Sequence, residues 1–263
     1  MNKLLVNGAE LAYRDEGSGQ PIIFLHAFPL NQKMWDDQIT VLAANYRVIT
    51  FDWRGFGQSS LGNGISRIDT FADDLAGMMN ELSIDRAIVC GLSMGGYAAF
   101  AFYRHYSNRV SALILADTRS TADTEEGKRN RYEMAELARS QGSAALVATM
   151  VPKLIGETTL RDQAHIAERV KVMIEASQPE GVAQALIAMA SRPDSSDLLP
   201  QINCPTLIIV GKEDKLTPPA ESEKMYEAIT GSSLEIIQEA GHLPNIEQTE
   251  SFNRAVSEFL SKL

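Results

Sequence analysis

One serine in the chain lies in a sequence context that would make its hydroxyl a nucleophile. Ser93 is the central residue of the segment 91–95, Gly-Leu-Ser-Met-Gly, which fits the pattern G-x-S-x-G. The apolar run 87–90 before it is typical of a buried strand, and residues 93–106 have helical spacing. A serine at such a strand-to-helix turn is strained and exposes its hydroxyl, and the flanking glycines make room for the turn. A serine that merely caps the helix is the alternative, but a cap does not require a buried strand to end directly before it.

A serine hydroxyl needs an adjacent base, which a third group must orient. The chain has four histidines, at positions His26, His105, His165 and His242. His242 follows the last predicted strand, 234–237, and therefore emerges at the carboxyl edge of a parallel sheet, where Ser93 also lies. His26 follows the first core strand, His105 is predicted to lie on a solvated helix face, and His165 belongs to a helical insert. We therefore expect His242 to be the base.

The acid that orients this base is predicted to be Asp214. It follows the penultimate strand, 206–210, and gives the chain order Ser, Asp, His that a hydrolase of this architecture requires. Asp214 would alternatively cap a helix that starts near Pro218, but Thr217 is the more natural cap for that helix. The competing acids are Glu213 and Asp117, the latter directly after the strand 112–115.

Strands and helices alternate on both sides of one long helical region. Continuous apolar runs mark strands that are covered on both faces, and repeated strand–helix–strand units indicate a parallel sheet. The predicted strands are 3–6, 10–14, 22–25, 48–51, 87–90, 112–115, 206–210 and 234–237. The helices between and after them are predicted at 35–44, 67–82, 93–106 and 248–262. The fold class is therefore α/β, with a mostly parallel, doubly wound, eight-stranded sheet.

Residues 1–118 and 200–263 form the predicted core domain, and residues 119–199 form an inserted helical lid over Ser93. Four helical segments are expected in this lid, at 124–141, 143–154, 158–176 and 179–191. Flexible apolar side chains there would accommodate varied acyl groups: Met134, Met150, Val151, Leu154, Met173 and Met189.

The chain resembles the α/β-hydrolase superfamily, within the cluster of serine esterases, 3-oxoadipate enol-lactonase-like proteins and perhydrolases that use no cofactor. The resemblance runs over essentially the whole chain. It rests on the segments 26–29 (His-Ala-Phe-Pro), 52–59 (Asp-Trp-Arg-Gly-Phe-Gly-Gln-Ser), 91–96, 211–214 and 241–242. These motifs are specific for the superfamily and much less specific for a substrate.

An attack by Ser93 would create an oxyanion that needs hydrogen-bond donors. One donor is expected to be the backbone N–H of Met94, which opens a helix. The resemblance implies the backbone N–H of Phe28 as the second donor and makes His26 a residue that braces this loop. Ala27 stands where relatives usually have glycine. Asp52 and Arg54 are interpreted as a salt-bridged structural turn without a chemical role.

The lid also contains basic residues, one of which would fix a substrate carboxylate if the chain acts as its lactonase relatives do. The candidates are Arg119, Arg129, Arg131, Arg139, Lys153, Arg161 and Arg169. The sequence does not choose among them.

The composition excludes several other classes of protein. Acidic residues outnumber basic ones, 34 to 24, and the resulting net charge of −10 opposes binding to nucleic acid. The two cysteines, Cys90 and Cys204, are expected to be separate buried thiols in a reducing compartment. The apolar run at the N-terminus is too short for a signal peptide, and we find no membrane-length apolar stretch, so we expect a cytoplasmic protein. We expect no metal and no cofactor, and homo-oligomerisation stays open.

Taken together, these patterns predict a carboxylic-ester hydrolase that cleaves small esters or lactones through an acyl-enzyme on Ser93. The nearest alternative is a perhydrolase or haloperoxidase that uses the same three side chains without a cofactor, and a C–C bond hydrolase comes third. Dehalogenases and epoxide hydrolases would need an aspartate at position 93. The competing non-enzymatic class is a ligand receptor that has kept the hydrolase fold.

Overall fold

The computed structural model describes residues 1–65 and 67–263, and an eight-stranded sheet forms its centre. The strands are β1 (Asn2–Val6), β2 (Ala9–Glu16), β3 (Pro21–Leu25), β4 (Arg47–Phe51), β5 (Ala87–Leu92), β6 (Val110–Ala116), β7 (Thr206–Gly211) and β8 (Ser233–Ile237). Their order in the sheet is β1-β2-β4-β3-β5-β6-β7-β8. The pairs β1–β2 and β2–β4 are antiparallel, and the other pairs are parallel. The predicted α/β fold with a mostly parallel sheet is confirmed.

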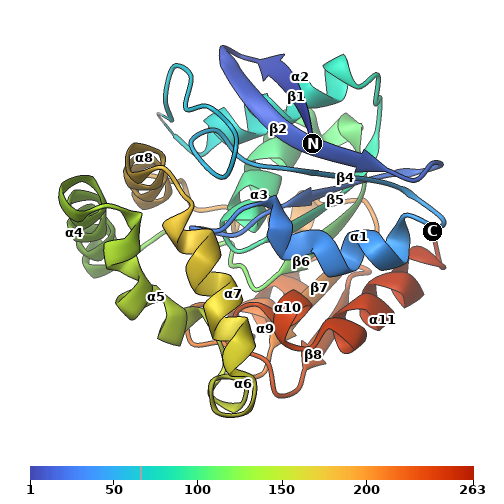
Figure 1. Cartoon of the computed structure of the whole chain (residues 1–263). Helices are drawn as coiled ribbons and strands as arrows, with labels where there is room; N and C mark the ends of the chain where they lie inside the picture. Colours follow the sequence, from blue (N-terminus) through green and yellow to red (C-terminus); the bar gives the residue numbers. More distant parts are fainter. Residues whose placement is uncertain (66) are drawn as a thin grey trace.

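Helices cover both faces of this sheet, which explains the continuous apolar runs of its central strands. The helices α1 (Asp36–Leu42) and α11 (Thr249–Leu260) pack together on one face, and α2 (Asp69–Glu81) and α3 (Met94–Tyr106) pack together on the other (Figure 1). In β3, residues 22–25 are all buried, and every residue of β5 is buried. Two more helices, α9 (Pro219–Ala228) and the short α10 (Pro244–Glu247), lie in the connections on either side of β8.

The regular elements between β6 and β7 are all helices. Residues 117–205, all of them described, contain α4 (Glu125–Gln141), α5 (Val147–Leu154), α6 (Glu157–Asp162), α7 (Ala164–Glu175) and α8 (Pro179–Ala190), and no strand. Figure 1 shows these helices grouped at one end of the sheet. We refer to residues 119–199 as the cap.

Two of the cap helices differ from the prediction. The helix expected at 158–176 is split at Gln163, whose backbone leaves the helical region (φ −135°, ψ 58°). The helix expected at 143–154 begins as a 3₁₀ turn (Ser143–Leu146) and becomes α-helical only at Val147.

The two cysteines are free, as expected, because Cys90 lies in β5 and Cys204 precedes β7, with β6 between these strands. Cys90 is buried but Cys204 is only half-buried, so the expectation of two buried thiols was wrong for Cys204. Among the described residues, we find no helix that combines the length and the apolar character needed to cross a membrane.

Candidate active site

Ser93 occupies the tight turn between β5 and α3. Its backbone has φ 56° and ψ −112°, a conformation that costs a non-glycine residue about 1–3 kcal/mol. The backbone N–H of Ser93 donates to the carbonyl of Ala116 (3.0 Å), which ties the turn to β6. A Cβ atom on Gly91 would lie 2.3 Å from the carbonyl oxygen of Gly95, and one on Gly95 would lie 2.2 Å from that of Leu25. The two glycines of the motif are therefore required by close backbone contacts, as the sequence predicted.

His242 and Asp214 are joined by a buried hydrogen bond. The imidazole Nδ1 of His242 lies 2.8 Å from the carboxylate Oδ2 of Asp214, and these side chains are 1% and 0% exposed. They come from the loops that follow β8 and β7, two neighbouring strands of the sheet. Because Nδ1 donates to the carboxylate, Nε2 is the ring nitrogen that remains available to accept a proton.

Thr217 gives Asp214 a further partner that the sequence analysis missed. Its hydroxyl donates to Oδ2 of Asp214 (2.6 Å) and lies 3.3 Å from Nδ1 of His242. The prediction that Thr217 caps the next helix was wrong, because Pro218 is the N-cap and α9 starts at Pro219. The hydroxyl is instead turned inward, where a buried carboxylate attracts it more strongly than exposed backbone N–H groups do.

The electrostatics of this pair favour an ionised carboxylate. Burial raises the pKa of Asp214, but the charge and hydrogen bond of His242, together with Thr217, more than offset that effect. The pKa of Asp214 therefore lies below its ordinary value. An ionised Asp214 holds the proton of the imidazole on Nδ1.

The two competing acids have other partners. Asp117 follows β6 and accepts a hydrogen bond from the backbone N–H of Gly211 (2.8 Å). Burial, and next the charge of Asp214, raise the pKa of Asp117 well above its usual range. Glu213 is turned towards the cap, where it accepts hydrogen bonds from the backbone N–H (2.9 Å) and the hydroxyl (2.5 Å) of Thr158.

Asp117, Asp214 and His242 have ligand-type atoms within 4.8 Å of one another, a grouping that no spacing in the sequence revealed. Two of the three groups are already joined, since Asp214 is hydrogen-bonded to His242. Asp117, whose raised pKa favours its protonated form, is a poor metal ligand. We interpret this cluster as a group of titratable side chains that bind protons, and not as a metal site.

A cavity of about 200 Å³ brings Ser93 and His242 together under the cap. Its other lining residues are Phe28, Tyr97, Arg119, Asp123, Gly127, Asn130, Arg131, Met134, Met150, Lys153, Leu186, Met189, Leu216 and Thr217. Ser93 is half-buried at its wall, and Asp214 lies behind His242 without lining the cavity. Of the cap side chains expected to supply flexible apolar surface, only Met134, Met150 and Met189 reach this cavity.

One expected oxyanion donor belongs to the residue that follows Ser93 in the chain, and the other belongs to a residue that shares its cavity. Phe28 lines the cavity, and Met94 is the first residue of α3. Among the described residues, neither backbone N–H has a hydrogen-bond acceptor. Ala27 is absent from the residues with positive φ, so this loop does not require the glycine that relatives usually have there.

His26 braces the same loop. Its Nε2 accepts a hydrogen bond from the backbone N–H of Trp53 (3.0 Å), and its Nδ1 donates to the carbonyl of Ala27 (3.0 Å). Burial lowers the pKa of His26 to about 4, so the ring is neutral and its Nε2 can accept. The predicted bracing role agrees with these contacts.

The expected salt bridge between Asp52 and Arg54 was wrong. Asp52 accepts backbone hydrogen bonds from Gln32 (2.8 Å) and Gln58 (2.9 Å), whereas Arg54 forms a buried ion pair with Asp74 of α2. The two side chains are close in sequence, but they belong to different buried networks.

The cap wall of the cavity carries more positive than negative charge. Asp123 binds three guanidinium groups at once, those of Arg119 (2.7 Å), Arg131 and Arg192 (2.9 Å). Burial raises the pKa of Asp123, but Arg131 and Arg192 lower it to about 2. Arg119 and Arg131 line the cavity and share this one carboxylate, which leaves the wall positively charged.

Lys153 adds a further positive charge to this wall. Its side chain has no ion pair or hydrogen bond with any of the residues described. Three other candidates pair away from the cavity: Arg139 with Glu180, Arg161 with Asp162 and Arg169 with Asp37. Arg129 does not line the cavity either, so the structure narrows the seven basic candidates to Arg119, Arg131 and Lys153.

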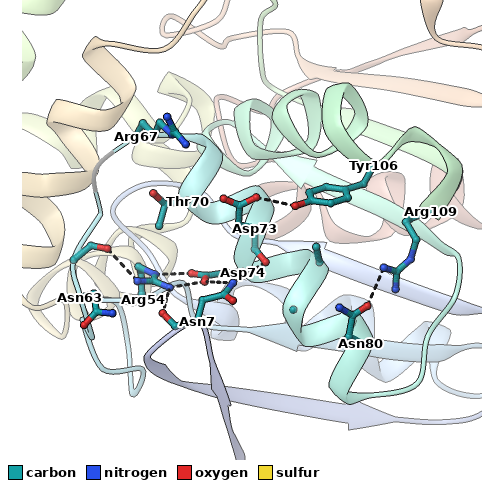
Figure 2. Close-up of a pocket in the computed structure, with 13 residues that line it drawn as sticks. Asn7, Arg54, Asn63, Arg67, Thr70, Asp73, Asp74, Asn80, Tyr106 and Arg109 are labelled. Atoms are coloured by element: carbon teal, nitrogen blue, oxygen red, sulfur yellow. Dashed lines mark hydrogen bonds and ion pairs between the residues drawn. The ribbon is translucent and has the colours of Figure 1, made fainter.

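A larger hollow of about 570 Å³ lies on another part of the surface, beside α2 and the end of α3. Figure 2 shows that its polar side chains bind one another: Arg54 with Asp74, Tyr106 with Asp73, and Arg109 with Asn80. It contains neither Ser93 nor His242. The smaller cavity is therefore the candidate active site.

Known proteins resemble this chain over nearly its full length. A family model described as the alpha/beta hydrolase fold matches residues 20–249. A thermophilic esterase from Thermogutta terrifontis, solved with malate bound, is 42% identical, has a TM-score of 0.97, and the match covers 100% of this chain and 99% of that one. The 3-oxoadipate enol-lactonase 2 of Acinetobacter baylyi is 31% identical, over 92% of this chain and 88% of that protein.

A third relative has a different described activity. A non-heme chloroperoxidase from Kitasatospora aureofaciens is 28% identical, over 97% of this chain and 98% of that protein. Esterases, enol-lactonases and haloperoxidases thus share the architecture found here. The chain belongs to the α/β-hydrolase family, among its esterase-like and enol-lactonase-like members.

Proposed function

We propose that the protein is a serine hydrolase that cleaves small carboxylic esters or lactones through an acyl-enzyme on Ser93. One observation carries this proposal: Ser93, on its strained turn, shares a cavity with His242, and Asp214 holds the imidazole from behind at 2.8 Å. A nucleophile, a base and an orienting acid are the three groups that acyl transfer at a serine requires.

The reaction runs in two halves. Oγ of Ser93 attacks the carbonyl carbon while Nε2 of His242 takes the hydroxyl proton. The tetrahedral intermediate then breaks the C–O bond to the leaving alcohol, which receives that proton from the imidazolium. In the second half, water gives a proton to His242 and attacks the acyl carbon, and the acid leaves as Ser93 regains its proton.

The N–H groups of Phe28 and Met94 are the proposed oxyanion donors. Both are unused within the described chain, and Met94 lies at the positive end of the α3 dipole. Loss of one such donor typically costs about 3–4 kcal/mol of transition-state stabilisation.

The charge of the cap wall indicates which esters fit best. Arg119, Arg131 and Lys153 outnumber the single carboxylate of Asp123, and guanidinium and ammonium groups bind carboxylates well. The cavity volume of about 200 Å³ suits a short acyl chain. We therefore propose short esters or lactones that carry a free carboxylate, in keeping with relatives described as a 3-oxoadipate enol-lactonase and as an esterase with malate bound.

Hydrolysis of p-nitrophenyl acetate and butyrate by the purified protein tests the proposal. We expect turnover by the wild type, covalent labelling by a fluorophosphonate probe, and loss of both in Ser93→Ala. Turnover that persists in a folded Ser93→Ala variant would refute the mechanism. Slow labelling without any turnover would instead indicate a receptor.

The same site would also serve perhydrolysis, which the similarity to a non-heme chloroperoxidase supports. Hydrogen peroxide would then replace water as the acceptor of the acyl group and yield a peracid. The two activities separate when peracid and acid are measured from one ester at increasing peroxide concentration.

A further inference from the structure

Glu247 is a buried carboxylate that lies outside the cavity. It is the last residue of the short helix α10, five positions after His242, and is 3% exposed. Its Oε1 accepts hydrogen bonds from the backbone N–H groups of Gly241 and Leu243, each at 3.0 Å. One carboxylate oxygen thus holds the peptide groups on both sides of His242.

The second oxygen of Glu247 reaches the cap. Oε2 accepts a hydrogen bond from the backbone N–H of Gly156 (2.8 Å), the residue that precedes α6. The two backbones meet here directly, because a Cβ atom on Gly241 would lie 2.2 Å from the nitrogen of Gly156. The loop of His242 and the cap are therefore in contact, and one side chain binds both.

This arrangement offsets the cost of burying a charge. Burial raises the pKa of Glu247, while hydrogen bonds from Gly156, Gly241 and Leu243 oppose that rise. A carboxylate with three backbone donors is well solvated by the protein. All three donors belong to the His242 loop or to the cap, so the carboxylate is stable only when both segments are in place.

We propose that Glu247 is a positioning residue that fixes the loop of His242 through Gly241 and Leu243 and also ties this loop to the cap at Gly156. The consequence for catalysis rests on the proposed function, in which His242 is the base. Glu247 does not line the cavity, so it acts through the loop and does not touch the substrate.

Two conservative variants separate its hydrogen-bonding geometry from its charge. Glu247→Asp keeps the charge but shortens the side chain by one C–C bond, about 1.5 Å, which withdraws the acceptor from Gly241 and Leu243. Glu247→Gln keeps the length, and its one carbonyl oxygen can still accept from both of these groups. The amide NH₂ of the Gln side chain would then face the N–H of Gly156, and only the bond to the cap is lost.

Glu213→Gln is the matched control, because the side chain of Glu213 also binds the cap, at Thr158, but makes no hydrogen bond with the His242 loop. The backbone N–H of Glu213 donates to the carbonyl of Ala240 in that loop (2.7 Å), and the substitution leaves this bond in place. For each folded variant we would measure kcat, KM and the hydrogen exchange of the Gly241 and Leu243 amides. We expect Glu247→Asp to lower kcat by about tenfold or more, because small misplacements of a catalytic group are costly. For Glu247→Gln we expect kcat to fall by roughly threefold at most, with the main effect on KM. Glu213→Gln should show the same small change in kcat and a similar change in KM.

Amide exchange at Gly241 and Leu243 should accelerate in Glu247→Asp alone. Wild-type kcat together with wild-type exchange in Glu247→Asp would overturn the proposal, and so would a Glu213→Gln variant that loses as much kcat as Glu247→Asp. A wild-type protein that hydrolyses no ester would refute the proposed function only. The exchange rates would still decide whether Glu247 holds the loop.

Discussion

The Nδ1 atom of His242 and the Oδ2 atom of Asp214 lie 2.8 Å apart, although the two residues are 28 positions apart in the chain. Their loops follow β8 and β7, which are neighbours in the sheet and end at the same edge. The parallel sheet therefore brings the base and the acid together. The turn after β5 places Ser93 in the wall of the cavity that His242 also lines.

Replacing Asp214 and Asp117 by asparagine, one at a time, should show which of the two orients His242. Asp214→Asn removes the acceptor of the Nδ1 proton and favours the wrong tautomer of His242, so we expect kcat to fall about 10⁴-fold. Asp117→Asn should keep activity within about tenfold, because asparagine still accepts the hydrogen bond from Gly211. Ester hydrolysis by both variants, with circular dichroism to verify folding, checks this. The opposite ranking would assign the acid to Asp117.

The raised pKa of Asp117 also predicts how stability depends on pH. At a pH above its ordinary value of 3.8 the unfolded chain has lost this proton, whereas the folded protein still holds it. The folded state then binds more protons than the unfolded state, so this group makes the free energy of unfolding fall as pH rises from about 4 towards the raised pKa.

Asp117→Asn removes this dependence. The melting temperature of the variant relative to the wild type should be nearly unchanged at pH 4 and should rise with pH until the raised pKa of Asp117 is passed. Thermal unfolding of both proteins across this range measures the effect. A difference that is constant with pH would show that Asp117 titrates alike in the folded and unfolded states.

Thr217→Val tests the second partner of Asp214. Valine keeps the shape but removes the hydroxyl that donates at 2.6 Å, so one charge-assisted hydrogen bond is lost. We expect kcat to fall by about three- to tenfold and the free energy of unfolding to fall by about 1–2 kcal/mol. Thr217→Ser keeps the hydroxyl and is the control. A Thr217→Val variant with full activity would show that the hydroxyl does not support Asp214.

Lys153→Met should change selectivity more than overall activity. Lys153 is the cation of the cavity wall that has no partner among the described residues, so its charge is available to a substrate carboxylate. For a matched pair of p-nitrophenyl esters, succinate and butyrate, we expect kcat/KM to fall about tenfold or more for the succinate ester and to stay nearly constant for the butyrate ester. Equal effects on both esters would argue against carboxylate recognition by Lys153.

The sequence predicted the parts of this structure that depend on local patterns. Apolar runs located the strands, and the glycines around Ser93 predicted a turn whose backbone contacts do exclude a Cβ atom. The order of the strands along the chain then placed the loops of Asp214 and His242 at one edge.

Contacts between distant segments could not be predicted from local sequence patterns. The ion pair of Arg54 with Asp74, the inward hydroxyl of Thr217 and the three donors of Glu247 each depend on side-chain directions that no periodicity encodes. The split at Gln163 is likewise not visible in the apolar spacing of the segment. Among seven basic side chains of the cap, only their position in the folded chain distinguishes those at the cavity.

In the proposed mechanism Ser93 carries the acyl group during turnover. Mass spectrometry of the protein, quenched in acid while it turns over a slowly deacylated p-nitrophenyl ester, would detect this intermediate. We expect an added acyl mass that maps to the peptide containing Ser93 and is absent from Ser93→Ala. An adduct on another residue, or rapid ester hydrolysis by a folded Ser93→Ala protein, would contradict it.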